Sequence, residues 1–267
     1  MIGDFHTHTH LSDGSMQLRD LVEYAKQRGI KYLGITDHDT LLTKAQASKL
    51  SDSEITVIGG AEFSCIDTDT GRKVHILCFL PDDEDKLLAH CEKVQKDRDI
   101  AGLKMAKKVM KLYPITLESV ISHKGNSKSV FKQHIMHSII ERGYTLDFYG
   151  TIYKDLFGKN GSCYEKVPYP TVEEMISLIK ECGGVCILAH PKVYDSIKLA
   201  HRLAKEGKID GIEVHHHSAN EQIREELLGI CKQYNLIVTG GSDFHGLYSA
   251  NPRTVGFCTT EESEIKK

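Results

Sequence analysis

The sequence lacks the features of a membrane-spanning or exported protein. No apolar run approaches the roughly 18 residues that a transmembrane helix needs. Residues 1–6 show neither the basic region nor the apolar stretch of a signal peptide. Prolines number only 6, and with 40% hydrophobic and 27% charged residues the composition leaves no room for a long disordered tail. We therefore expect a soluble, cytoplasmic globular protein without a membrane partner.

A surplus of positive charge and a paired-cysteine motif are also missing. The net charge is −3 and the isoelectric point is near 6.6, so any contact with a nucleic acid or a phosphate must be local. No extended nucleic-acid groove is expected. The 8 cysteines include no Cys-x-x-Cys pair, and most lie within apolar runs. Buried, reduced thiols are therefore favoured over disulfides or a thiolate metal site.

What the sequence does contain is an alternation of short apolar runs and amphipathic stretches, which is typical of a mostly parallel β/α sheet. At 267 residues, the chain has the length of a barrel of parallel strands and helices. Helices are predicted around Leu18 behind Ser15, around Met175 behind the N-cap Thr171, and from Asn220 to Tyr234. Strands are predicted at residues 2–6, 31–36, 55–62, 73–80, 184–189, 209–215 and 236–242.

Residues 82–169 interrupt this alternation. They contain a charged helix (82–112), a Gly-Asn-Ser loop at 125–127 and a second helical stretch, without a convincing strand. A segment that leaves a barrel after one strand and returns before the next lies over the end that carries the βα loops. We therefore predict a barrel formed by residues 1–81 and 170–267, and an inserted helical lid subdomain at 82–169.

Histidines and carboxylates accompany the predicted strands. His6 and His8 stand two residues apart at the end of the first strand, so they face the same side. With 15 histidines in the chain, about one such pair is expected by chance. Metal-ligand residue types recur at the ends of the later strands, however: Asp37, His38 and Asp39, Glu62, His75, His190, Asp243 and His245. Imidazoles and carboxylates at one edge of the sheet indicate a site for Mn²⁺, Zn²⁺ or Fe²⁺.

In their order and spacing, these motifs resemble those of the PHP (polymerase and histidinol phosphatase) family. They read His-x-His-x-x-x-Ser-Asp-Gly, Ile-Thr-Asp-His-Asp-Thr, Gly-x-Glu, Val-His-Ile-Leu, Leu-Ala-His-Pro, Asp-Gly-Ile-Glu-Val and Ser-Asp-x-His. The most similar branch is that of the stand-alone metal-dependent phosphoesterases. The resemblance implies a distorted (β/α)7 barrel with a helical insertion before the Ala-His-Pro strand. Members of this branch act on nucleoside 3′,5′-bisphosphates, short oligonucleotides or five-membered cyclic phosphates.

The resemblance also implies two or three bound divalent cations. The first would be held by His6, His8, Glu62 and Asp243, the second by the bridging Glu62 with His75 and His190, and the third by Asp13, His38 and His245. Two such ions can share a hydroxide that attacks phosphorus directly. A histidine of the third site, or a water on its metal, would protonate the leaving oxygen. This makes Asp13, His38 and His245 the candidate catalytic residues.

Other residues near these motifs are expected to play supporting roles. Asp37 and Asp39 are predicted to orient imidazoles, and Glu213 to be structural or to orient a ligand. The histidine tract at 215–217 is predicted to line the pocket, and His10 to face solvent. The helical and polar surroundings of His90, His123 and His201 predict surface positions.

The predicted lid is where the chain departs from the family pattern. Nucleotide-acting members often have Gly-Arg-Pro-His where this chain has Phe131-Lys132-Gln133-His134, so a bidentate arginine is replaced by a lysine. The candidate substrate-binding residues are Lys132, His134, Tyr164 and Lys192.

The leading hypothesis is hydrolysis of a small phosphate ester, such as a nucleotide, a nucleoside 3′,5′-bisphosphate or a sugar phosphate. One alternative is a cyclic phosphodiesterase acting on a five-membered ribose cyclic phosphate. A 3′-5′ exonuclease is disfavoured by the acidic balance, because tracking a strand calls for a basic groove. A histidinol-phosphate phosphatase is disfavoured by the helical insertion, which those relatives usually lack. A purely structural metal site would be closed by about four ligands and would not need so many.

Overall fold

The structure, a computed structural model, describes residues 2–250 and 253–265 and contains one continuous sheet. Its order is β7-β6-β5-β4-β3-β2-β1-β8, and a hydrogen bond of 3.0 Å from Phe5 N to Gly240 O links the first strand back to the seventh, so the sheet nearly closes into a barrel. The distorted barrel is therefore confirmed. The strands are β1 (Ile2–Asp4), β2 (Tyr32–Ile35), β3 (Thr56–Ile66), β4 (Lys73–Phe79), β5 (Val185–Leu188), β6 (Gly211–His215), β7 (Ile237–Gly240) and β8 (Thr260–Glu261).

The seven predicted strands are all present, but the sheet is less parallel than the sequence analysis predicts. β4 runs antiparallel to both β3 and β5, and the short β8, which was not predicted, runs antiparallel to β1. A tight turn joins β3 to β4, in which Asp67 accepts hydrogen bonds from Asp69 N and Thr70 Oγ1. So short a connection permits only an antiparallel pair, since a parallel crossover needs about a dozen residues. As a result, the start of β4 lies at the edge of the sheet where β3 and β5 carry their functional residues.

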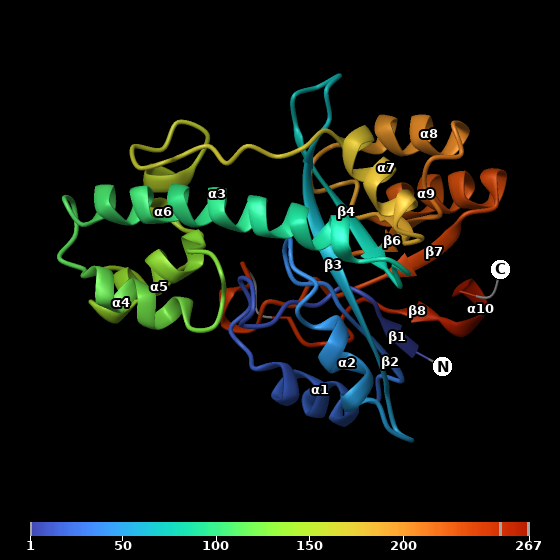
Figure 1. Ribbon diagram of the computed structural model, residues 1–267, viewed down its shortest axis with the longest axis horizontal. Coiled ribbons are helices and arrows are strands. Elements are labelled where there is room, and N and C mark those ends of the chain that lie inside the picture. The colour runs from blue at the N-terminus through green and yellow to red at the C-terminus, as the bar shows by residue number, and fades with distance from the viewer. Residues whose placement is uncertain (1, 251–252, 266–267) are drawn as a thin grey trace.

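Helices cover the outer face of the barrel, with α7 to α9 on one side and α1 and α2 on the other (Figure 1). Thr171 caps its helix as predicted, with Glu174 completing a capping box, and Asn220 caps α9. Ser15 does not cap α1: Gln17 holds that position, and Ser15 Oγ accepts a hydrogen bond from Leu247 N at 2.8 Å instead. The bounds are α1 (Leu18–Gln27), α2 (Lys44–Leu50), α7 (Val172–Glu181), α8 (Ile197–Lys205), α9 (Glu221–Tyr234), the 3-10 turn η1 (Gly246–Tyr248) and α10 (Glu262–Ile265).

Residues 82–169, here called the helical insert, form a lobe beside the barrel (Figure 1). The lobe consists of α3 (Asp85–Val109), α4 (Leu117–Lys124), α5 (Lys132–Glu141) and α6 (Thr151–Phe157), and none of its residues, all of which are described, lies in a strand. The lobe has its own apolar cluster, to which Met105 and Val109 belong, whereas Leu87 and Cys91 at the other end of α3 pack in the barrel core. One long helix thus joins the two cores.

The barrel core lies mainly between the strands and α7 to α9. Fully buried side chains such as Phe63, Ile76, Ile179, Leu203 and Ile212 form it. None of the 8 cysteines, which all lie among the described residues, forms a disulfide, and all but the half-buried Cys258 are buried, as the sequence predicts. Within the described ranges, no helix combines the length and apolar character that crossing a bilayer requires.

Candidate metal centre and substrate cavity

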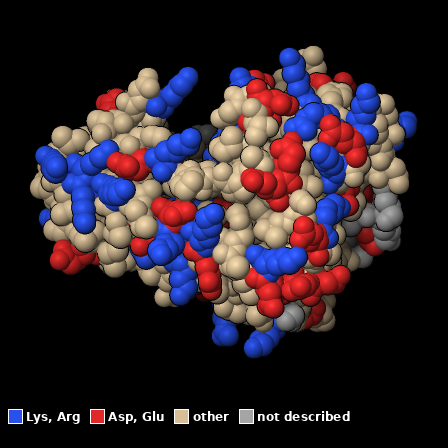
Figure 2. Space-filling view, turned by 45° about the horizontal axis from the view of Figure 1, so that its top comes forward, with Lys and Arg blue, Asp and Glu red and all other residues tan. Residues whose placement is uncertain are grey.

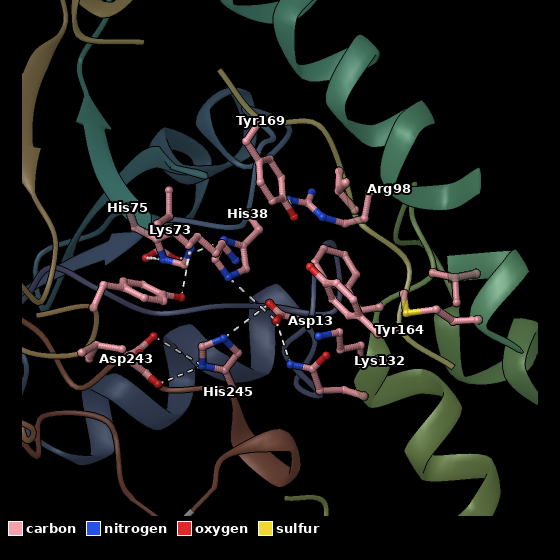
Figure 3. A pocket seen from close by; sticks show the side chains of 18 of the residues that line it. Asp13, His38, Lys73, His75, Arg98, Lys132, Tyr164, Tyr169, Asp243 and His245 are labelled. Carbon is pink, nitrogen blue, oxygen red and sulfur yellow. Dashed lines mark hydrogen bonds and ion pairs between the residues drawn. The ribbon is translucent and has the colours of Figure 1, made fainter. Parts of the chain in front are cut away.

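A cavity of about 310 Å³ lies between the mouth of the barrel and the helical insert (Figure 3). The barrel contributes polar groups, among them Asp13, His75 and His245. The insert contributes Phe131, Lys132, Tyr153 and Tyr164, among others. A small molecule in this cavity would therefore touch both parts of the chain.

The first two histidines, on the segment that follows β1, lie behind the cavity wall and contact its lining residues Glu62 and Asp243. Thr7 forms an isolated parallel bridge with Phe244, which keeps the backbone extended, so His6 and His8 on either side of it point the same way. Their ring centroids are 5.1 Å apart. Gly241 is needed here because a Cβ at this position would collide with Cβ of His6. The chain thus brings two buried imidazoles together.

Glu62 stands at the centre of the site, and its two carboxylate oxygens face different histidines. Oε2 lies 3.4 Å from His6 Nε2 and 3.3 Å from His8 Nε2. Oε1 lies 2.8 Å from His190 Nε2 and contacts His75 Nδ1. Such an arrangement would suit a carboxylate that bridges two cations.

Asp243 completes the first set of ligand groups. Its Oδ1 lies 3.6 Å from His6 Nε2 and 3.3 Å from His8 Nε2. Both Asp243 and His190 have positive φ angles, 52° and 25°, which are uncommon for residues with side chains and are often found at functional sites. The His190 backbone is held by a 2.7 Å hydrogen bond from its N–H to Glu213 Oε2.

A further set of ligand groups surrounds Asp13. Its Oδ1 lies 3.4 Å from His245 Nε2, and its Oδ2 lies 3.8 Å from His38 Nε2 (Figure 3). Gln133 on α5 donates a 3.0 Å hydrogen bond to Asp13 Oδ2. The helical insert therefore touches this set directly.

The groups present fit divalent metal ions. Several buried side-chain atoms have no hydrogen-bond partner among the described residues: His6 Nε2, both ring nitrogens of His8, Asp13 Oδ1, His38 Nδ1 and His190 Nδ1. Buried polar atoms are rarely left unpaired, so these atoms call for a ligand. A mixed set of imidazoles and carboxylates suits Mn²⁺, Zn²⁺ and Fe²⁺.

The pKa shifts of these side chains agree with a role in metal binding. Burial lowers the pKa of His38 to about 3 and that of His75 well below its ordinary value, so both rings are neutral and can offer a lone pair. Burial alone would raise the pKa of Glu62, but His75, His38 and His6 around it hold that pKa well below its ordinary value. Burial alone would lower the pKa of His245, but the carboxylates of Asp13 and Asp243 raise it to about 10.

Of the predicted supporting residues, Glu213 contacts the ligand candidate His6, whereas the two aspartates beside His38 form other contacts. Glu213 Oε1 lies 3.0 Å from His6 Nδ1. Asp37 instead accepts hydrogen bonds from Thr9 and Ser12, and Asp39 pairs with Arg98. Asp37 precedes His38 in extended backbone and so points away from it, whereas Asp39 lies in a turn with a φ of 48° and faces Arg98.

The histidines outside the nine ligand candidates differ in their surroundings. His216, in the tract predicted to line the pocket, is buried, with Nε2 3.6 Å from Asp243 Oδ2. His10 is only partly exposed, with Nε2 3.3 Å from Asn126 Nδ2. His201 is exposed as predicted, but His90 and His123 are half-buried, because α3 and α4 pack against neighbouring elements.

The predicted substrate-binding residues fall into two groups. Lys132 and Tyr164 line the cavity, and Lys132 Nζ lies 4.8 Å from the centre of the Tyr164 ring. His134 does not line it: it is buried and accepts a hydrogen bond from Phe131 N at the start of α5. Lys192 is exposed and lies outside the cavity lining.

Other residues that line the cavity were not predicted from the sequence, among them Lys73, Arg98, Tyr153, Tyr169 and Tyr194. A signal for Lys73 was present, because it precedes His75 by two residues on one strand and so shares its face. No comparable signal marked Arg98, which reaches the cavity from α3 only after the insert has packed on the barrel.

Comparison with known proteins places these observations in a family. The PHP domain model matches residues 4–167. The phosphoribosyl 1,2-cyclic phosphate 1,2-diphosphodiesterase of Eggerthella lenta is 33% identical over 262 residues, which cover 96% of this chain and 98% of that protein. A 5′-3′ exoribonuclease of Escherichia coli is 27% identical over 254 residues, 92% of this chain and 85% of the relative.

Solved structures agree. A candidate metal-dependent phosphoesterase from Bifidobacterium adolescentis has a TM-score of 0.88 and 27% identity, covering 99% of this chain and 94% of that one. The match to the family model, the near full-length relatives and the clustered ligand groups lead to one conclusion: this chain belongs to the PHP family and is a metal-dependent phosphoesterase.

Proposed function

We propose that this enzyme hydrolyses a small phosphate ester that carries a second anionic group, and that the two groups bind at opposite sides of the cavity. The observation that carries the proposal is a pair of cations that line the cavity, Lys73 beside His75 and Arg98 on the side of the helical insert (Figure 3). The cavity volume of about 310 Å³ suits a small ligand, at the lower end of the usual range for such sites.

The reacting phosphate would sit at the ligand groups described above. His6, His8, Glu62 and Asp243 would hold one ion, Glu62, His75 and His190 a second, and Asp13, His38 and His245 a third. When bound, such cations supply Lewis acidity that activates water and stabilises charge on the phosphate oxygens. We propose that the ions are Mn²⁺, Zn²⁺ or Fe²⁺.

Side chains of the protein would orient the metal-ligand residues and supply a proton to the leaving oxygen. Glu213 accepts from one ring nitrogen of His6 and so fixes the other toward the cavity. Where the third ion does not bind, His245, whose pKa is raised to about 10 by its carboxylate neighbours against the effect of burial, is the group placed to protonate the departing oxygen. Tyr194 keeps His75 in place, with its hydroxyl 3.4 Å from His75 Nε2.

The second anionic group would bind between Lys73 and Arg98. The ring of Tyr169 lies near both, 5.3 Å from Lys73 Nζ and 5.6 Å from Arg98 Cζ. Arg98 pairs with Asp39 through Nη2, while its buried Nη1 has no hydrogen-bond partner among the described residues. Lys73, by contrast, forms no ion pair with a carboxylate of the described residues. One carboxylate for two cations leaves a positive charge that an anionic substrate group would neutralise.

We further propose that the helical insert acts as a lid over the bound substrate. Lys132, Tyr153 and Tyr164 form the wall opposite the barrel, and the hydrogen bond from Gln133 to Asp13 ties that wall to the ligand groups. Phenol rings suit the faces of a ribose or a base, and Lys132 adds a third cation.

Among substrates of this kind, a ribose cyclic phosphate that carries another phosphate agrees best with the Eggerthella lenta relative, whose name states such a substrate. The Escherichia coli relative favours a second candidate, removal of a terminal nucleotide from RNA. The face of the molecule in Figure 2 mixes acidic and basic side chains, which supports the small substrate over a long strand.

The test is a substrate panel with product analysis. Protein reconstituted with Mn²⁺ would be incubated with a 5-phosphorylated ribose 1,2-cyclic phosphate, the same compound without the 5-phosphate, a nucleoside 3′,5′-bisphosphate and a 5′-phosphorylated RNA, and products would be followed by phosphorus NMR. We expect the compounds with two phosphates to be preferred by at least about tenfold in kcat/KM. If the RNA is turned over fastest, the result favours the second candidate, removal of a terminal nucleotide from RNA. If none of the four compounds is hydrolysed, both candidate functions are contradicted.

A further inference from the structure

A second cluster of metal-ligand residue types lies on the helical insert, away from the cavity. His123 near the end of α4 faces His137 and Glu141, which stand four residues apart on one face of α5. The potential ligand atoms of the three side chains all lie within 4.8 Å of one another. None of the three lines the substrate cavity.

The contacts within this cluster are close but leave ligand atoms unsatisfied. His123 Nε2 lies 2.9 Å from Glu141 Oε2, yet this buried nitrogen has no hydrogen-bond partner of suitable geometry among the described residues. The rings of His123 and His137 stack with centroids 3.8 Å apart and an angle of 15° between them. Two charged imidazoles would repel each other at this distance, so at least one ring is neutral and offers a lone pair.

Neighbouring groups hold the cluster in a ligating arrangement. His137 Nδ1 lies 3.0 Å from the hydroxyl of Tyr248, which leaves Nε2 as its free ring atom. Ser119 Oγ donates a 3.2 Å hydrogen bond to Glu141 Oε2. Metal-binding histidines and carboxylates usually have such outer partners, which fix their orientation. A surface hollow lined by Ser119, Ser122 and Arg142 gives water access to the cluster.

We propose that His123, His137 and Glu141 form a separate binding site for one divalent transition-metal ion. Two imidazoles and one carboxylate are a ligand set that Zn²⁺ accepts, with water from the hollow as the fourth ligand. The site is independent of the catalytic ligands and would serve to fasten α4 to α5.

The same ion would also connect the insert to the catalytic end of the barrel. Tyr248, the outer partner of His137, lies in η1, directly after the ligand candidate His245. Its carbonyl accepts a 2.9 Å hydrogen bond from Tyr149, whose hydroxyl also lies 3.1 Å from Gln133 Nε2. Metal binding at the insert therefore holds one end of a hydrogen-bonded chain that reaches Asp13 through Gln133.

The test counts metal ions. Chelator-stripped wild-type protein and the variants His123→Ala and Glu141→Gln would be dialysed against buffered Zn²⁺ and analysed for zinc. The matched control is His201→Ala, which removes an exposed histidine paired with Glu226 at 3.1 Å. We expect each test variant to bind one ion fewer per chain than wild type and the control, or to bind that ion at least about 100-fold more weakly.

Stability provides an independent readout. Because an ion that binds only the folded state stabilises it, saturating Zn²⁺ should raise the Tm of wild type by about 5 °C more than that of Glu141→Gln. Glu141 is exposed, so its substitution should leave the protein folded even if His123→Ala does not. Equal zinc content and equal Tm shifts in wild type and Glu141→Gln would overturn the proposal.

Discussion

At the scale of single residues, the alternation of side chains along extended backbone explains which expectations about the site succeeded. His6 and His8 lie on one side of the chain as their spacing predicts, and the same rule, not applied to Asp37, places that residue away from His38. The sequence did not show that His134 is buried against its own helix or that Lys192 is exposed outside the cavity, because the cavity lining is set only when the insert packs on the barrel.

Glu62 is the residue whose loss should affect metal binding most. Since its two oxygens face two sets of histidines, Glu62→Gln should lose more metal than any single histidine substitution, with affinity falling by about 10–100-fold at both sites. Metal analysis after reconstitution measures this. Glu226→Gln, an exposed change, should retain the wild-type content. A Glu62→Gln protein with full metal content would show that the carboxylate does not bridge.

Asp13→Asn tests the third set of ligand groups. The substitution keeps the size of the side chain but removes the charge that faces His38 and His245. We expect a folded protein that retains about two metal ions and loses about 100-fold in kcat, equivalent to about 2.7 kcal/mol in the barrier. Steady-state kinetics measure the change in kcat, and metal analysis counts the ions that the variant retains. Wild-type turnover with one ion fewer would show that the third set is dispensable.

Lys132 should give substrate binding a pH dependence. Burial, with a further contribution from Lys73, lowers the pKa of Lys132 to about 8, so the side chain is charged at pH 7 and neutral above pH 9. KM for an anionic substrate should therefore rise several-fold between these pH values. Lys132→Ala should raise KM about tenfold at pH 7 with unchanged metal content, and Lys132→Arg should flatten the pH profile. Wild-type kinetics in Lys132→Ala would show that Lys132 does not contact substrate.

At the scale of the elements, sequence patterns located the strands but not their directions. Apolar runs mark where a strand lies, whereas the antiparallel course of β4 depends on the short turn at 67–72 and on pairing with β5. This is why His75, near the start of its strand, reaches the same site as residues at the ends of others. The caps of α7 and α9 were predictable because they need only local residues.

The contact of α3 with the barrel rests on a buried ion pair. Arg98 and Asp39 are 5% and 0% exposed, so Arg98→Ala would leave a buried carboxylate without its partner. We expect the free energy of unfolding to fall by about 3–5 kcal/mol, measured by urea denaturation of metal-free protein. Arg19→Ala, on the exposed face of α1, should change it by less than about 0.5 kcal/mol. Equal stability of the two variants would mean that Asp39 is satisfied without Arg98.

At the scale of the whole molecule, the chain has two apolar cores that share α3, and the cavity lies where the two parts meet. The motifs predicted the metal-ligand candidates because each one is local in sequence. The Lys73 and Arg98 pair was not predictable in the same way, since it exists only once the insert has packed over β4. Under the proposed function, substrate choice is thus a property of the assembled molecule.

The most direct test of the account compares two substrates in two variants. A phosphate ester with a second phosphate and the same ester without it would be assayed with wild type, Lys73→Met and Lys192→Met, the last being an exposed control. We predict that wild type and the control prefer the doubly phosphorylated compound by at least about tenfold in kcat/KM, and that Lys73→Met, with unchanged metal content, loses most of this preference. Equal kcat/KM values for the two compounds in wild type, or an undiminished preference in Lys73→Met, would contradict the account.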